Sequence, residues 1–294
     1  MSLLLDREFL RTLEQLTLLS REGFSGAMGI DHRSRNRGSG LEFADYRRYS
    51  YGDDPRFLDW NVYLRLGKLF LKLYQIEEQI PVRVLLDCSA SMAFGEGAEE
   101  KFAYAQRLAA VFSFVALLHL DTAAIVPFAE HMAKPIVAAG GRDRFWPIAH
   151  FINELRCAGR TDIVRSVKDF LGHFTSRGVV VLISDFFDDD GCERAVNMLR
   201  FAGHDFVLVH LHTAEEQRPR EHGELLLEDI ESGTRQPIDC SPESAAAYEA
   251  AFEEFSQRLR RLAVRNGGRY VRAATSVPYQ AFVLDGLRSD QVLA

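Results

Sequence analysis

The fold is decided by the stretch Val82-Arg83-Val84-Leu85-Leu86-Asp87-Cys88-Ser89-Ala90-Ser91. Its first half is almost entirely apolar, and its second half consists of small and polar residues. A short apolar run of this kind is typical of a strand that is buried on both faces of a parallel sheet. We therefore expect a central strand here, followed by a polar loop at the carboxyl end of the strand.

Strands and helices alternate along the rest of the chain. Apolar runs predict further strands at 123–128, 179–183, 206–211 and 269–271. Longer segments predict helices at 99–119, 145–155, 163–174, 192–202 and 244–266, and a hairpin is expected at 223–239. This alternation predicts an α/β fold with a doubly wound, mainly parallel sheet. Ligand sites of such folds lie beyond the carboxyl ends of the strands.

Composition and charge limit the possible functions. The chain has 294 residues, of which 47% are hydrophobic, and a formal net charge of −7. A folded protein is expected, and broad nucleic-acid binding is disfavoured because it requires a basic surface. The apolar stretch 108–129 is interrupted by Asp121, so we interpret it as a buried helix followed by a strand and not as a membrane span.

The cysteines indicate the cellular compartment in which the protein is found. Cys88, Cys157, Cys192 and Cys240 are scattered, and no pair has the C-x-x-C spacing of a zinc or redox site. The amino-terminal residues do not resemble a signal peptide. We therefore expect a cytoplasmic protein with reduced thiols.

The first 79 residues are expected to form an N-terminal extension that packs on the domain formed by residues 80–294. The pattern predicts a helix at about 7–20 and a strand at 69–80. Between them lies a Gly/Arg/Ser-rich loop that contains Arg33, Arg35 and Arg37. We interpret these arginines as a solvated loop; the alternative is a contact for an acidic partner.

Oxygen-bearing side chains follow three of the predicted elements. Asp87, Ser89 and Ser91 form a D-x-S-x-S loop after the central strand, Thr161 precedes a predicted helix, and Asp185 ends another strand. Hard cations such as Mg²⁺ prefer oxygen ligands in octahedral geometry. The sequence therefore predicts one divalent metal at these five residues. The alternative is that Asp87 and the serines only cap the helix that follows them.

These residues resemble the metal-ion-dependent adhesion site of von Willebrand factor A domains. The resemblance implies Mg²⁺, or Mn²⁺ or Ca²⁺ in its place, bound by Ser89, Ser91 and Thr161. Asp87 and Asp185 would act largely through water. One coordination position would remain open for an Asp or Glu of a partner protein. The family usually has glycine after the third-loop aspartate, whereas Phe186 stands here, which puts the shape of this loop in doubt.

Charged and aromatic residues alternate densely at 43–65, around a G-D-D-P-R sequence. We expect Asp53, Asp54 and Asp59 to pair with arginines, and Trp60 and Tyr49 to pack the segment on the sheet. The arginines of this expected network are Arg47, Arg56 and Arg65.

The same segment carries a second resemblance. The G-D-D-P-R core followed by D-W strongly resembles a bacterial family of unknown function, in which this motif precedes a von Willebrand factor A domain. The likeness extends from about residue 26 to 209. Members are often encoded with MoxR-type AAA+ ATPases, so the resemblance implies that the protein functions together with such an ATPase.

The function expected from these features is metal-dependent binding of a protein partner, without catalysis. The alternative is a Mg²⁺-dependent phosphohydrolase that uses Asp87. Phosphatases of doubly wound folds have D-x-D at this loop, whereas Ser89 stands at the third position here. The chain also lacks a G-x-x-x-x-G-K-[ST] loop for nucleotide phosphates.

Overall fold

The computed structural model describes residues 5–14, 16, 42–75, 80–95, 100–119, 121–219, 223–231, 233–290 and 292–293. The chain divides into two compact units, Met1–Gly26 with Ile80–Ala294, and Ala27–Gln79. The sequence interpretation grouped residues 1–79 together. In the structure, Leu5, Phe9 and Leu13 are buried in the core of the larger unit, so the first helix belongs with the sheet. The Arg33–Arg37 loop lies outside the described residues.

A six-stranded sheet forms the centre of the larger unit. Its strand order is β10-β7-β6-β3-β4-β5, and every neighbouring pair is parallel except β4 and β5. The fold is therefore mixed α/β with a mostly parallel sheet, as expected from the sequence. The strands are β3 (Pro81–Asp87), β4 (Thr122–Phe128), β5 (Ile136–Ala139), β6 (Val179–Ser184), β7 (Asp205–His212) and β10 (Arg269–Ala274).

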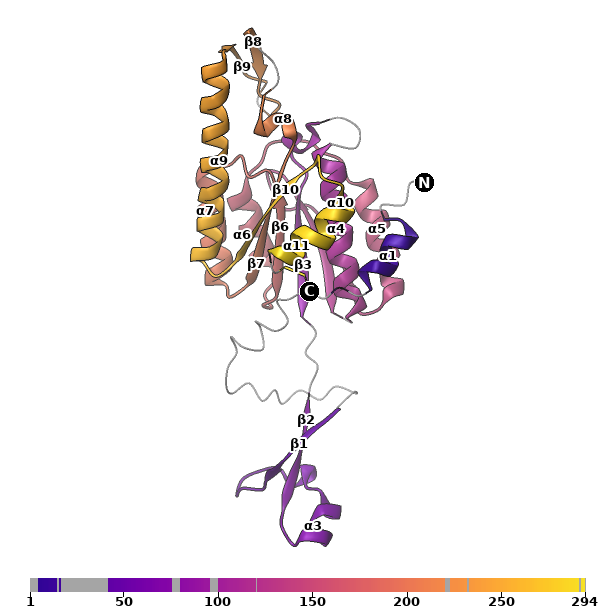
Figure 1. Cartoon of the computed structure of the whole chain (residues 1–294). Coiled ribbons are helices and arrows are strands. Elements are labelled where there is room, and N and C mark those ends of the chain that lie inside the picture. The colour runs from indigo at the N-terminus through magenta and orange to yellow at the C-terminus, as the bar shows by residue number, and fades with distance from the viewer. Residues whose placement is uncertain are drawn as a thin grey trace. The chain divides into compact units, whose positions relative to one another are not determined.

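Helices cover both faces of this sheet (Figure 1). Alternate residues of β3 point to opposite faces, so Val84 belongs to one hydrophobic cluster and Leu85 to the other. The Val84 side is covered by α1 (Arg7–Leu13), α4 (Lys101–Leu118) and α5 (Phe145–Glu154). The Leu85 side is covered by α6 (Ile163–His173), α7 (Asp189–Phe201) and α9 (Pro242–Arg265).

Helix α4 is the one described helix that is long and apolar enough to cross a membrane by length and composition. Its mean hydropathy is 1.3, and 78% of its 18 residues are buried inside the larger unit. A helix that is apolar on all sides is expected wherever its whole circumference is covered by protein. The following turn and β4 match the interpretation of residues 108–129 as helix and strand.

Shorter elements complete the larger unit. A single turn, α8 (Ala214–Gln217), follows β7, and an antiparallel hairpin is formed by β8 (Gly223–Glu228) and β9 (Arg235–Cys240). The remaining short helices are η2 (Ala90–Ala93), η4 (Arg142–Arg144), α10 (Tyr279–Ala281), η5 (Phe282–Gly286) and α11 (Leu287–Ser289).

The smaller unit contains the G-D-D-P-R segment. Its strands β1 (Glu42–Arg48) and β2 (Phe70–Gln75) pair in antiparallel fashion. Two short helices lie between them in the chain, η1 (Pro55–Phe57) and α3 (Trp60–Leu66). Gly67 ends α3 with a φ of 63°, in the left-handed region that favours glycine.

Candidate metal centre

The two predicted aspartates lie at the carboxyl ends of neighbouring strands. Asp87 is the last residue of β3, and Asp185 directly follows β6. Because β3 and β6 are parallel neighbours, these ends meet at one edge of the sheet. Asp87 is 0% exposed and Asp185 is 1% exposed. The topology thus brings two carboxyl groups together in a place without bulk water.

Backbone hydrogen bonds tie the D-x-S-x-S loop to the loop that carries Thr161. Ala90 N donates to Gly159 O at 2.9 Å, and Ala158 N donates to Cys88 O at 2.8 Å. Thr161 follows Gly159 by two residues and is half-buried. All five predicted metal residues therefore lie at the same end of the sheet.

The hydroxyls of Ser89 and Ser91 have a spacing that suits a metal. Their Oγ atoms form a hydrogen bond at 3.0 Å. Two adjacent ligands of an octahedral Mg²⁺, each at about 2.1 Å, are separated by about 3.0 Å. Among the residues that the structure describes, no group of three or more His, Cys, Asp or Glu could hold a metal ion. Coordination here would therefore depend on the serine and threonine hydroxyls.

Both carboxylate oxygens of Asp87 accept hydrogen bonds. Its Oδ2 accepts a hydrogen bond from Ser184 Oγ at 2.6 Å, and its Oδ1 accepts one from Ser89 N at 2.9 Å. Burial raises the pKa of Asp87 to about 7, and the negative charge of Asp185 adds to this effect. Burial and the neighbouring carboxylate thus both disfavour the ionised form of Asp87.

A lysine that the sequence analysis did not single out contacts the other carboxylate. Lys101 Nζ lies 2.7 Å from Asp185 Oδ2 and 2.5 Å from Glu216 Oε1, and Lys101 is 0% exposed. Glu216 is itself held by Thr213 in a capping box at the start of α8. The T-x-x-E pattern of a capping box is visible in the sequence, whereas nothing local marks Lys101 as a partner of Asp185.

The third loop adopts a conformation that glycine usually takes. Phe186 has a φ of 58° and is the only non-glycine residue with positive φ in the described part of the chain. Its ring is fully buried, and its backbone N donates to Ser184 Oγ at 2.9 Å. Phe186 therefore adopts the left-handed conformation itself, at some cost in strain that its burial and hydrogen bond offset.

Thr161 contacts a residue that the sequence analysis missed. Its Oγ1 donates to Glu231 Oε1 at 2.8 Å, and its N donates to Glu231 Oε2 at 3.2 Å. Glu231 lies in the turn between β8 and β9, 70 residues further along the chain. The hairpin itself was predicted, but its contact with the Thr161 loop has no local signal in the sequence.

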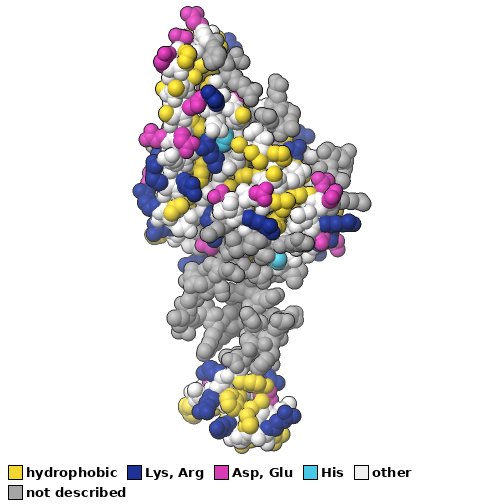
Figure 2. Space-filling model, viewed as in Figure 1, with side chains coloured by type: hydrophobic (Ala, Val, Ile, Leu, Met, Phe, Trp, Pro, Cys, Tyr) yellow, Lys and Arg dark blue, Asp and Glu magenta, His cyan; other side chains and the backbone are white. Residues whose placement is uncertain are grey.

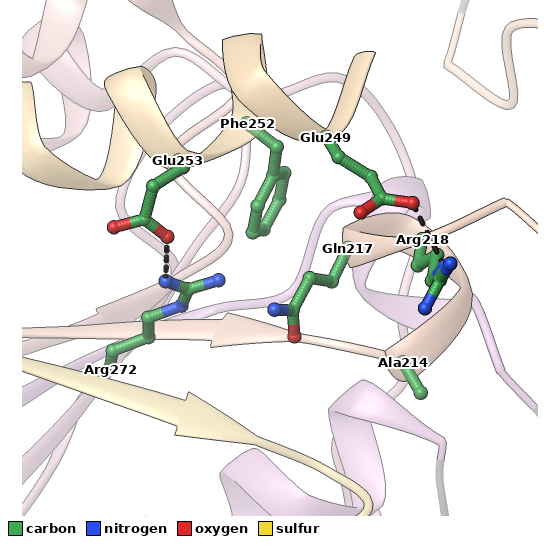
Figure 3. Close-up of a pocket in the computed structure, with 7 residues that line it drawn as sticks. All are labelled: Ala214, Gln217, Arg218, Glu249, Phe252, Glu253 and Arg272. Carbon is green, nitrogen blue, oxygen red and sulfur yellow. Dashed lines mark hydrogen bonds and ion pairs between the residues drawn. The ribbon is translucent and has the colours of Figure 1, made fainter. Parts of the chain in front are cut away.

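A pocket lies beside α8 (Figure 3). Its volume is about 460 Å³. Its charged side chains are paired, with Arg218 at 2.9 Å from Glu249 and Arg272 at 2.6 Å from Glu253. It is lined by Ala214, Gln217, Arg218, Glu249, Phe252, Glu253 and Arg272. Because both arginines are neutralised by carboxylates, the pocket presents no net charge for an ionic ligand.

The predicted ion-pair network occupies the smaller unit. Arg47 pairs with Asp53 at 2.7 Å, and Arg56 pairs with Asp54 at 2.5 Å. Arg65, which was expected to join them, makes no ion pair with any residue that the structure describes.

Asp59 has different partners from those expected. It accepts hydrogen bonds from Tyr46 at 2.8 Å and pairs with Lys72 at 3.1 Å. Its other oxygen caps α3 by accepting from the backbone N of Asn61 and Val62. Asp59 thereby connects β1, β2 and α3, and its side chain is only 5% exposed.

Trp60 was expected to be a packing residue. It is 59% exposed and touches Tyr63 edge-on. Figure 2 shows hydrophobic side chains on the visible face of this smaller unit, beside Lys and Arg side chains. The packing of the segment onto the sheet stays a prediction.

A family model described as "Protein of unknown function DUF58" matches residues 45–258. The chain belongs to this family. It is similar to the uncharacterized protein Mb1516 of Mycobacterium bovis and to the uncharacterized protein Rv1480 of Mycobacterium tuberculosis. Each is 25% identical over 246 residues, which cover 81% of this chain and 75% of the relative.

Two solved structures are similar at low identity. The conserved hypothetical protein BatB from Bacteroides thetaiotaomicron is 14% identical with a TM-score of 0.43, over 72% of this chain and 98% of that one. An aerotolerance-related membrane protein from Bacteroides fragilis is 16% identical with a TM-score of 0.43, over 71% of this chain and 99% of that one. These TM-scores are too low to carry an argument about function.

Proposed function

We propose that the chain is a metal-dependent protein-binding module of the von Willebrand factor A type. Mg²⁺, or Mn²⁺ or Ca²⁺ in its place, would be held by Asp87, Ser89, Ser91, Thr161 and Asp185. The bound ion would coordinate an acidic side chain of a partner protein. The observation that carries this proposal is the pair of buried carboxyl groups, Asp87 and Asp185, beside serine hydroxyls at ligand spacing.

The local charge supports a divalent cation. Lys101 supplies one positive charge among the carboxyl groups of Asp87, Asp185 and Glu216. Buried carboxylates are costly unless they are paired with cations. A divalent ion would supply the missing charge and allow Asp87 to remain ionised at neutral pH.

The ligand set also supports binding of an acidic group. Three neutral hydroxyls, with the two aspartates acting largely through water, would leave a divalent ion with substantial positive charge. A carboxylate entering the remaining position gains Coulomb energy that a neutral group does not. The bound ion would therefore select an Asp or Glu side chain of the partner.

The phosphohydrolase alternative is less favoured. Asp87 is fully buried, and each of its oxygens already accepts a hydrogen bond, from Ser184 or from the backbone of Ser89. A nucleophilic carboxylate needs an oxygen that is free to reach a phosphorus atom. The second carboxylate expected of such a phosphatase is replaced by Ser89.

The partner that we propose is a MoxR-type AAA+ ATPase, on the resemblance of the G-D-D-P-R segment and its following domain. The ATPase would supply nucleotide hydrolysis, and this chain would act as its accessory or adaptor in assembly or maturation of other proteins. The sheet unit would provide the metal-dependent contact.

The test is capture of the MoxR-type ATPase by the full chain. Wild type, Asp87→Ala and Thr161→Ala are each compared with Mg²⁺ and with EDTA, and Ser113→Ala serves as a control. Ser113 is a buried serine within α4 whose hydroxyl donates to Ala109 O of the same helix. We expect capture by wild type and Ser113→Ala in Mg²⁺ alone. Equal capture in every lane contradicts the metal bridge, and no capture by wild type contradicts the named partner.

A further inference from the structure

The turn between β8 and β9 brings a carboxylate to the candidate metal centre. Glu231 is half-buried, and both of its carboxylate oxygens accept hydrogen bonds from Thr161. The turn is fixed by two further contacts. Glu231 N donates to Asp229 Oδ1 at 2.9 Å, and Arg160 Nε donates to Glu231 O at 3.3 Å. The carboxylate is thus held against the Thr161 loop from several directions.

The hydrogen bond between the two side chains brings their oxygens close enough to bind the same ion. Thr161 Oγ1 and Glu231 Oε1 are 2.8 Å apart, close to the separation of about 3.0 Å between adjacent octahedral ligands. Thr161 uses its hydroxyl hydrogen for Glu231, which leaves its oxygen lone pairs available to a cation. A carboxylate beside a threonine ligand is also the arrangement proposed above for the partner's acidic side chain.

We infer that Glu231 is an internal ligand of the metal and fills the position proposed for the partner. This inference rests on the proposed function. The hairpin β8–β9 then acts as a tethered competitor, because a carboxylate on the same chain is present at high effective concentration. A partner must displace Glu231 to reach the ion, and contacts that move the hairpin away favour the partner.

The experiment counts the water molecules on bound Mn²⁺. Water-proton relaxation and Mn²⁺ affinity are measured for the full-length wild type, Glu231→Gln, and the control Glu228→Gln. Glu228 lies on the same hairpin and forms an exposed ion pair with Arg235. Glutamine keeps the size of the side chain but is a much weaker ligand. We expect Glu231→Gln to bind Mn²⁺ at least about tenfold more weakly and to gain one exchangeable water.

Acetate serves as a probe of the vacated position. It should lower the relaxation enhancement of Glu231→Gln by displacing the new water, and it should leave wild type and Glu228→Gln almost unchanged. Mn²⁺ binding with identical affinity and water count in all three proteins overturns the inference but leaves the metal site intact. No Mn²⁺ binding by wild type, or binding that survives Asp87→Ala, overturns the proposed function and this inference with it.

Discussion

Lys101 and Asp185 form a buried ion pair, with 2.7 Å between Nζ and Oδ2, at the carboxyl end of the central sheet. Both side chains are at most 1% exposed. The lysine lies at the first turn of α4 and orients the aspartate that we place at the metal. The pair therefore links the stability of the fold to the geometry of the site.

Replacing Lys101 by methionine should destabilise the protein strongly. The change leaves Asp185 and Glu216 without their shared cation, and breaking a buried pair in this way typically costs about 3–5 kcal/mol. Unfolding by urea measures the loss. Arg235→Met is the matched control, because its pair with Glu228 is exposed and should contribute at most about 1 kcal/mol. Similar stabilities of the two variants would show that the buried pair does not hold the site together.

Mg²⁺ should stabilise the folded chain. A ligand that binds only the folded state at a hundredfold excess over its dissociation constant contributes about 2.7 kcal/mol. Thermal unfolding with Mg²⁺ or EDTA measures this effect in wild type, Ser89→Ala/Ser91→Ala and Ser113→Ala. We expect the response in wild type and Ser113→Ala, and its loss in the double variant. A response that persists in the double variant would locate the ion elsewhere.

The contribution of His212 to stability should be lost as the pH decreases from about 6.5 to about 4, while Asp87, whose pKa is raised by burial, contributes in the opposite direction. Burial lowers the pKa of His212 to about 4, and its neutral ring accepts from Arg272 Nε through Nε2. In the unfolded chain, the imidazole ring of His212 takes up a proton near pH 6.5. The stabilising contribution of the neutral His212 ring is therefore complete above pH 6.5 and is lost as the pH falls toward 4. The pKa shift of His212 corresponds to about 3 kcal/mol in the free energy of unfolding.

The pH dependence is measured by urea unfolding between pH 4 and pH 7. As the pH falls through this range, the stability of His212→Asn should rise relative to that of wild type. His150→Asn should show no such change, because the pair of His150 with Glu154 is exposed. His210, whose pKa is also lowered by burial, should leave a residual slope in His212→Asn. An unchanged slope in that variant would contradict the assignment.

The smaller unit should depend on Asp59 far more than on Arg56. The hydrogen bond from Tyr46, together with Lys72 and the backbone of α3, lowers the pKa of Asp59 to about 2. The stabilising effect of this carboxylate is present above its usual pKa near 3.8 and is lost as the pH falls through about 2. Among the described residues, Arg56 pairs only with Asp54, at the surface.

Limited proteolysis within residues 42–75 measures this difference at neutral pH. Asp59→Ala should increase the rate of cleavage, because it removes the helix cap and both cross-strand contacts. Arg56→Ala should leave the rate close to that of wild type. Equal rates for the two variants would show that Asp59 does not organise the unit.

The sequence patterns predicted the elements whose signals are local. Apolar runs identified β3 and β6, and their parallel pairing then places Asp87 beside Asp185. Strand β5 was not predicted, because Ile136–Ala139 has only four residues and is partly exposed. Strand β1 was also missed, since its residues mix charge and aromatic character without regular alternation.

The surroundings of the site could not be predicted in the same way. Lys101 and Glu231 reach Asp185 and Thr161 across 84 and 70 residues of chain, so only the folded topology reveals these contacts. Phe186 departs from the expected glycine in identity but keeps a positive φ. A left-handed conformation at a phenylalanine has no local signal in the sequence.

The most direct test of the metal centre is an anomalous difference map from crystals of the full chain soaked in Mn²⁺. We predict one peak at about 2.1–2.2 Å from the Oγ atoms of Ser89 and Ser91, with Thr161 on the same ion. The peak should be absent from crystals of Ser89→Ala/Ser91→Ala. A well-ordered loop without a peak in wild-type crystals, or a peak bound only by other residues, would contradict the account.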